Sequence, residues 1–182
     1  KTLSIPGYRQ SRNYSCGFAS TLMVARYFAP KVSAAELYQR LGTSRDGTRQ
    51  TAILRALRTL GVSANARYDV DYLRLKREID RGKPVISYLF DDEHWLVAYG
   101  YATNPDRVFV ADPRPGHPCV QVWTTYGRRL GQFGIVCSPQ ARRQPRDTAA
   151  PQPIVTSDRL LSASPSEIHS AQLDFDFEIK RR

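Results

Sequence analysis

The stretch that decides the fold is residues 84–101, which read PVISYLFDDEHWLVAYGY. It holds two short runs of β-branched and aromatic residues, 85–90 and 95–101, with acidic residues between them. Such runs, bounded by turn-forming residues, are typical of strands. The sequence therefore predicts two consecutive strands joined by an acidic turn.

Three further runs of the same kind follow toward the C-terminus, at residues 107–110, 119–123 and 132–136, separated by Gly, Pro, Asn and Asp. Short strands that follow one another with brief turns between them favour antiparallel pairing of neighbours. We expect these five strands to form a meander.

The residues before this stretch have helical patterning instead. Apolar side chains recur at helical spacing in four segments, 16–28, 33–41, 48–60 and 71–81. Asn13, Ser15 and Ser33 are N-cap residues by type, and glycines follow the last three segments. Helices followed by strands predict an α+β fold, with a helical N-terminal half packed on one side of an antiparallel sheet formed by the C-terminal half.

The composition divides the chain into two parts. Residues 1–140 contain all of the predicted helices and strands and read as one domain, whereas residues 141–182 are rich in Pro and Ser and read as a linker and tail. Near the end, residues 173–179 alternate apolar and acidic side chains, which indicates a terminal strand that docks on the sheet or on a partner, or else a plain tail.

The charge of the chain is strongly positive, with 27 Lys and Arg against 17 Asp and Glu and a formal net charge of +10. The basic residues are scattered, with no block and no nucleic-acid-binding motif, so we expect a solvated basic surface and no nucleic-acid partner. No apolar run approaches the roughly 18 residues that a membrane span requires, so no integral membrane span is predicted.

Cys16 is the first candidate for chemistry because it opens the first predicted helix. A thiol at a helix N-terminus meets unpaired backbone N–H groups and the positive end of the helix dipole, which lower its pKa and make it a nucleophile. Attack on a carbonyl creates an oxyanion, for which the backbone N–H of Cys16 and the side-chain amide of Gln10 are candidate donors.

His94 and Asp112 are the second and third candidates. His94 heads the strand at 95–101, and Asp112 ends the next strand of the meander. Because antiparallel neighbours place the start of one strand beside the end of the next, we expect both side chains at the same edge of the sheet. His94 would then act as the general base and Asp112 would orient its imidazole.

The remaining histidines and cysteines are weaker candidates for a functional site. His117 lies in a Pro- and Gly-rich turn and His169 in the tail, no Cys or His spacing matches a metal site, and no metal or cofactor is predicted. Cys119 and Cys137 are either buried inert thiols or a disulfide. A disulfide, together with an N-terminus that reads as trimmed, would favour a periplasmic location over a cytoplasmic or secreted one.

These residues together resemble the peptidase C39 family of papain-like cysteine peptidases, known for removing double-glycine leader peptides. The resemblance spans about residues 5 to 137 and is carried by Gln10, the Ser15-Cys16-Gly17 opening of a helix, Lys83-Pro84-Val85-Ile86, the segment from His94 to Gly100, and Val110-Ala111-Asp112-Pro113. It implies a papain-like fold, with Cys16 as nucleophile, His94 as general base, Asp112 as the orienting residue and Gln10 in the oxyanion hole. Family members commonly carry Asp where this chain has Ser15.

The resemblance implies a cysteine peptidase that cleaves a secreted peptide or protein, plausibly after a Gly-Gly leader motif, and that works beside a secretion system. The chain is similar to stand-alone members of the family, since no transporter segment accompanies it. Two alternatives stay open: a papain-like toxin or effector that deamidates or transfers at a protein amide, and an inactive peptidase-like module that binds a secretion signal.

Overall fold

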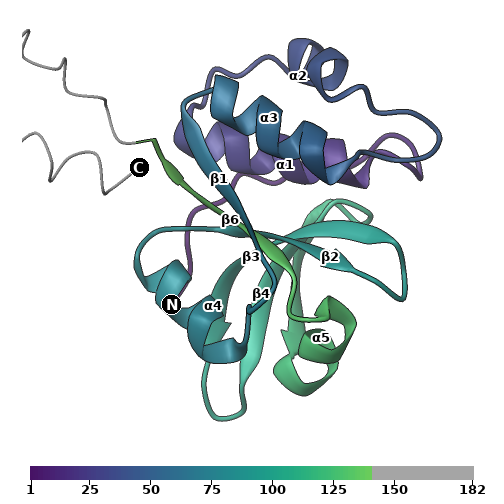
Figure 1. The fold of residues 1–182 in the computed structure, drawn as a ribbon. Coiled ribbons are helices and arrows are strands. Elements are labelled where there is room, and N and C mark those ends of the chain that lie inside the picture. The colour runs from purple at the N-terminus through teal and green to yellow at the C-terminus, as the bar shows by residue number, and fades with distance from the viewer. Residues whose placement is uncertain (141–182) are drawn as a thin grey trace, which may run out of the picture. The chain divides into compact units, whose positions relative to one another are not determined.

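The computed structural model describes residues 1–140 of the chain (Figure 1). The predicted linker, terminal strand and His169 lie outside the described residues. In chain order, the elements are α1 (Cys16–Phe28), α2 (Ala34–Leu41), α3 (Gln50–Thr59), β1 (Val62–Arg67), α4 (Tyr72–Asp80), β2 (Val85–Leu89), β3 (His94–Ala102), β4 (Arg107–Asp112), β5 (His117–Val122), α5 (Trp123–Leu130) and β6 (Gly134–Pro139). The α+β fold class is confirmed.

The six strands form one antiparallel sheet in the order β1-β6-β2-β3-β4-β5. Strands β2 to β5 follow one another across the sheet, as the meander prediction requires. The prediction is wrong for β6, which lies between β1 and β2 because Val136 pairs with Asn65 on one side and Val85 on the other.

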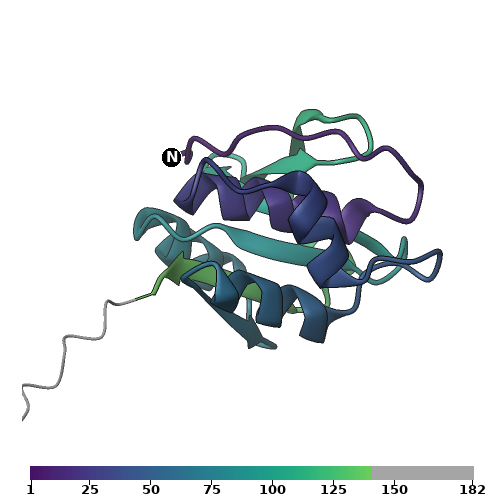
Figure 2. The same cartoon turned by 90° about the horizontal axis from the view of Figure 1, so that it is seen from above.

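Helices cover both faces of the sheet, so the expectation of helices on one side only is wrong. In Figure 1, α1, α2 and α3 lie above the sheet and α4 and α5 below it. Neighbouring residues of β2 point to opposite faces of the sheet. Ile86 packs in the core beneath α1–α3, and Val85 packs in the core against α4 and α5. In the view from above, the first three helices lie in front of the sheet (Figure 2).

The N-terminal segment runs along the sheet and brings residue 10 toward the start of α1. The backbone N–H of Leu3 donates to the Tyr99 carbonyl at 2.9 Å, and that of Tyr101 donates to the Lys1 carbonyl at 2.9 Å. Gly100 permits this approach, because a Cβ there would lie 2.9 Å from the Lys1 carbonyl oxygen. Further on, the backbone N–H of Gln10 donates to the Pro113 carbonyl at 2.8 Å.

The two cysteines considered for a disulfide lie at distant places in the sheet. Cys119 is on the edge strand β5, and Cys137 is on β6, four strand steps away. At about 4.8 Å a step, the separation is about 19 Å, far beyond the reach of an S–S bond. All three cysteines, which lie within the described part of the chain, are free thiols. The disulfide alternative is therefore wrong, and the periplasmic prediction loses that support.

Candidate active site

Cys16 is the first residue of α1, and its side chain is 5% exposed. Ser15 occupies the N-cap position as predicted, but its side chain does not cap the helix. Its hydroxyl donates instead to the Arg12 carbonyl at 2.9 Å and accepts from the Arg12 N–H at 3.2 Å. The first N–H groups of α1 thus have no side-chain cap, and the positive end of the helix lies at the Cys16 sulfur.

His94 and Asp112 lie side by side, where β3 begins and β4 ends. The His94 Nε2 and Asp112 Oδ1 atoms are 2.7 Å apart. This contact follows from the antiparallel pairing of the two strands, in which Val97 is opposite Ala111. Since Asp112 occupies Nε2, the other ring nitrogen, Nδ1, is the one left for the thiol of Cys16.

The electrostatics of the three side chains favour an ion pair. Burial alone raises the pKa of Cys16, but a hydrogen bond with His94, backbone hydrogen bonds from Trp95 and Gly17 and the charge of His94 lower it below that of an ordinary thiol. Burial alone lowers the pKa of His94, yet hydrogen bonds and charges of Asp112 and Cys16 raise it to about 9. These pKa shifts favour a thiolate on Cys16 and an imidazolium on His94, next to the carboxylate of Asp112.

The side chain of Gln10 contacts the loop before α1. Its Nε2 donates to the Arg12 carbonyl at 2.8 Å and the Asn13 carbonyl at 3.2 Å, and its buried Oε1 has no hydrogen-bond partner among the described residues. Neither amide contact reaches Cys16. The amide holds the loop before α1, and an oxyanion-hole role requires it to rotate away from these carbonyls.

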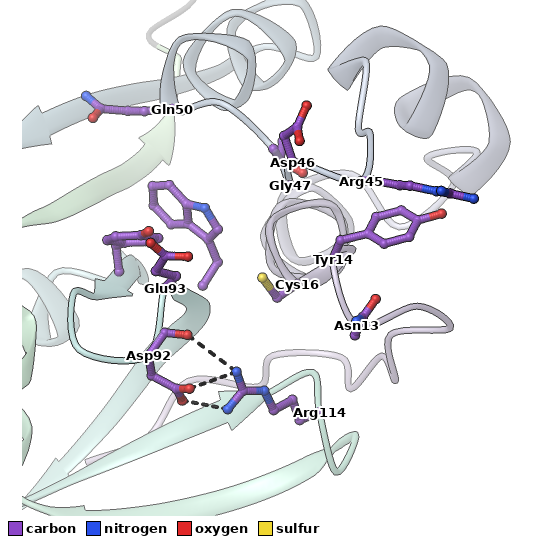
Figure 3. A pocket seen from close by; sticks show the side chains of 13 residues that line it. Asn13, Tyr14, Cys16, Arg45, Asp46, Gly47, Gln50, Asp92, Glu93 and Arg114 are labelled. Carbon is purple, nitrogen blue, oxygen red and sulfur yellow. Dashed lines mark hydrogen bonds and ion pairs between the residues drawn. The ribbon is translucent and has the colours of Figure 1, made fainter.

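A cleft of about 480 Å³ opens at Cys16 (Figure 3). The sulfur of Cys16 points into the cleft, with Glu93 and Asp92 on one side and Asn13 and Tyr14 on the other. The lining is mainly polar and comprises Asn13, Tyr14, Cys16, Arg45, Asp46, Gly47, Thr48, Gln50, Tyr88, Asp92, Glu93, Trp95 and Arg114.

Gly17 lets the walls of the cleft close around the start of α1. A Cβ at this position would lie 2.6 Å from Thr48 Cβ and 3.0 Å from Trp95 Cδ1, both closer than van der Waals contact. Thr48 is held in place by a 2.9 Å hydrogen bond between its hydroxyl and that of Thr43. Thr48 and Trp95 therefore pack closely against the start of α1.

Two residues of the site were missed by sequence reasoning. The sequence indicates for Asp92 only an acidic turn and gives no sign of a role for Arg114, yet the two form a bidentate ion pair at the cleft. Paired charges in two separate loops leave no periodic pattern in a sequence, so no signal could have joined them.

Among residues 1–140, the remaining candidate histidine is His117. His117 is exposed on β5, where its Nδ1 is 3.1 Å from the Pro118 carbonyl. Among residues 1–140, no group of three His, Cys, Asp or Glu side chains is arranged to hold a metal ion. Within the same residues, no helix has the length and apolar character that crossing a membrane would take.

Comparison with known proteins gives consistent matches. A family model described as the Peptidase C39 family matches residues 4–122. The pediocin PA-1 transport/processing ATP-binding protein PedD of Pediococcus acidilactici is 26% identical over 135 residues, which are 71% of this chain and 18% of that protein. The chain thus spans about a fifth of the length of this relative.

Two crystal structures share the fold. A double glycine motif protease from an AMS/PCAT transporter, solved in complex with the leader peptide, is 22% identical with a TM-score of 0.64, covering 76% of this chain and 94% of that one. The peptidase domain of Streptococcus ComA, a bi-functional ABC transporter involved in a quorum sensing pathway, is 20% identical with a TM-score of 0.62, covering 75% of this chain and 99% of that one.

Proposed function

The chain belongs to the peptidase C39 family and is a cysteine peptidase, and from this premise we propose that it cleaves a leader from a secreted peptide or protein after a Gly-Gly motif, with Cys16 as nucleophile. The observation that carries the proposal is the buried thiol of lowered pKa next to His94, whose imidazole is 2.7 Å from Asp112. Such a constellation serves attack on a carbonyl.

The proposed reaction proceeds through a thioester. The Cys16 thiolate attacks the scissile carbonyl, and the uncapped N–H groups at the start of α1 stabilise the oxyanion, joined by the Gln10 amide once it rotates. The imidazolium of His94 gives its proton to the leaving amine as the C–N bond breaks. Neutral His94 then takes a proton from water, whose oxygen attacks the thioester, and the acid leaves with restoration of the Cys16 thiolate.

Two observations support Gly-Gly as the motif before the cut. Thr48 and Trp95, which line the cleft, pack so close to α1 that a Cβ on Gly17 would lie 2.6 Å and 3.0 Å from them. Substrate residues without side chains fit such a space and adopt the backbone conformations that it requires. In addition, one structure that shares the fold is a double glycine motif protease bound to its leader peptide.

The proposal is tested with a synthetic leader-like peptide that carries Gly-Gly before the scissile bond and with a matched peptide that carries Val-Val there. Mass spectrometry of the products should show cleavage after Gly-Gly by the wild type and by Cys119→Ala, but no cleavage by Cys16→Ala and none of the Val-Val peptide. Cleavage by Cys16→Ala, or conversion of a side-chain amide to an acid without chain cleavage, would contradict the proposal.

A further inference from the structure

The turn after β4 connects two parts of the site through its backbone. The Arg114 N–H donates to Asp112 Oδ1 at 2.9 Å, so the carboxylate that contacts His94 is held from a second side. One residue earlier, the Pro113 carbonyl accepts the backbone N–H of Gln10 at 2.8 Å. The short turn at residues 113 and 114 thus restrains both Asp112 and the loop that leads to Cys16.

The side chain of Arg114 connects this turn to a third part of the site. Its guanidinium donates to Asp92 Oδ2 at 2.5 Å and to Asp92 Oδ1 at 3.0 Å, as Figure 3 shows. Asp92 is two residues before His94, and Glu93 between them has a left-handed backbone with φ of 45°. A residue other than glycine persists in that conformation only where its surroundings hold it.

The ion pair of Arg114 and Asp92 is too exposed to contribute much to the free energy of unfolding. The Arg114 and Asp92 side chains are 48% and 34% exposed, and pairs screened by solvent to this degree stabilise a fold by about 1 kcal/mol or less. A bidentate guanidinium–carboxylate pair nevertheless fixes both distance and orientation, which one ammonium group does not.

We propose that Asp92 and Arg114 form a positioning clamp that sets the imidazole of His94 and the carboxylate of Asp112 against Cys16. This inference rests on the proposed function, because it assigns the clamp to the same reaction. Neither residue is proposed to exchange a proton or to touch the scissile bond. Their effect is transmitted by the turn before His94 and the turn after Asp112.

If Asp92 acted only through its charge, its removal would shift the pH profile of Cys16 alkylation in the direction opposite to the one that a positioning role predicts. The titratable and charged groups that line the cleft around Cys16 or contact its thiol are His94, Tyr14, Tyr88, Arg45, Asp46, Asp92, Glu93 and Arg114. By charge alone, removal of the Asp92 carboxylate favours the thiolate and moves alkylation of Cys16 to lower pH. If the clamp positions His94, the same removal separates the imidazolium from the thiolate and moves alkylation to higher pH.

The deciding experiment compares the wild type, Asp92→Ala, Arg114→Lys and the control Asp69→Ala, which breaks a remote Asp69–Arg74 pair of 2.8 Å. The rate of Cys16 alkylation by iodoacetamide is measured against pH, and kcat and KM are measured with the Gly-Gly peptide. We expect Asp92→Ala and Arg114→Lys to shift the alkylation profile to higher pH and to lower kcat about tenfold or more with little change in KM. Asp69→Ala should match the wild type.

A shift to lower pH, or none, in Asp92→Ala would overturn the clamp, as would an unchanged kcat in Arg114→Lys. Urea unfolding of each variant separates local misplacement from loss of fold, and the clamp requires near-native midpoints. If the wild type leaves the peptide intact, the proposed function fails, while the alkylation profiles, which need no substrate, still decide the clamp.

Discussion

Cys16 and His94 titrate as a pair because each favours the charged form of the other. The thiol pKa is lowered and the imidazole pKa is raised to about 9, although burial alone would push both in the opposite direction. The ion pair therefore exists from the lowered pKa of Cys16 up to about pH 9. Asp112, whose burial alone would raise its pKa but whose hydrogen bond with His94 lowers it, stays ionised throughout this range.

This pairing predicts a bell-shaped dependence of kcat/KM on pH. Activity should rise as Cys16 ionises and fall as His94 loses its proton near pH 9, because the leaving amine then has no acid. Asp112→Asn removes a charge that raises the His94 pKa, so the falling limb should move to lower pH. Initial rates with the Gly-Gly peptide across the pH range measure both limbs, and an unmoved falling limb in Asp112→Asn would contradict the assignment.

Gly17 supplies a second prediction at this scale. The Cβ of Gly17→Ala would overlap Thr48, so we expect a loss of about 1–3 kcal/mol in the free energy of unfolding and a clear loss of peptidase activity from displacement of Cys16. Gly7→Ala is the matched control, since its Cβ would meet only the Gly116 carbonyl, at 3.6 Å. Urea denaturation measures both variants, and equal stabilities would show that the space around α1 is not tight.

At the scale of elements, α5 packs against the face of the sheet opposite α1. Tyr126 is fully buried, and its hydroxyl is 2.7 Å from Ser87 Oγ on β2. The hydrogen bond joins a helix to a central strand, and each hydroxyl finds its partner where both side chains are buried. Its role is to stabilise the fold, since Tyr126 does not line the cleft at Cys16.

Tyr126→Phe should therefore lower the free energy of unfolding by about 1–2 kcal/mol, because it leaves the Ser87 hydroxyl buried and unpaired. Ser87→Ala should cost a similar amount, and the double variant should cost less than the sum of the two. Urea denaturation of the four proteins gives the coupling, and additive losses would show that the hydrogen bond contributes nothing. The pH profile of Cys16 alkylation should be unchanged in all of them.

The same elements show what a sequence can predict here and what it cannot. The helices α1 to α4 and strands β2 to β6 have strong apolar periodicity or β-branched runs, and their segments were predicted. Strand β1 was missed because Ser63, Ala64 and Asn65 carry little strand preference, and it forms by pairing with β6. Helix α5 was missed because its Trp, Thr, Tyr and Gly residues disfavour a helix, which packing of Tyr126 and Leu130 overrides.

The residues of the site likewise include some whose arrangement the sequence predicts and some whose arrangement it does not. A helix opening at Cys16 and adjacent antiparallel strands at His94 and Asp112 are local patterns, so their proximity could be inferred from strand order. The ion pair of Asp92 and Arg114 depends on how two loops meet in space, and the amide contacts of Gln10 depend on the path of its own loop. Neither arrangement has a sequence pattern of its own.

At the scale of the whole molecule, one sheet covered by two helical layers keeps the cysteines apart. Cys16 opens α1, Cys119 is on the edge strand β5, and Cys137 is buried on β6. No pair of strands brings two of them together within residues 1–140. The fold thus presents one thiol whose pKa is lowered, Cys16, and two whose pKa values are raised, Cys119 and Cys137.

This arrangement predicts that purified protein, unfolded in denaturant without reductant and kept from air oxidation, titrates three thiols. Ellman's reagent or intact mass after alkylation gives the number, with a reduced sample as the reference. A count of one would indicate an intramolecular disulfide and would contradict the strand order of the sheet.

The state of the Cys16 thiol is best measured by the rate of its labelling with iodoacetamide as a function of pH. Peptide mass spectrometry also follows the labelling of Cys119 and Cys137 in the same sample. The pKa values of these two thiols are raised mainly by burial. We predict selective labelling of Cys16 below about pH 8 in the wild type and loss of that selectivity in His94→Ala. Labelling of Cys16 no faster than Cys119, or unchanged in His94→Ala, would contradict a thiolate–imidazolium pair.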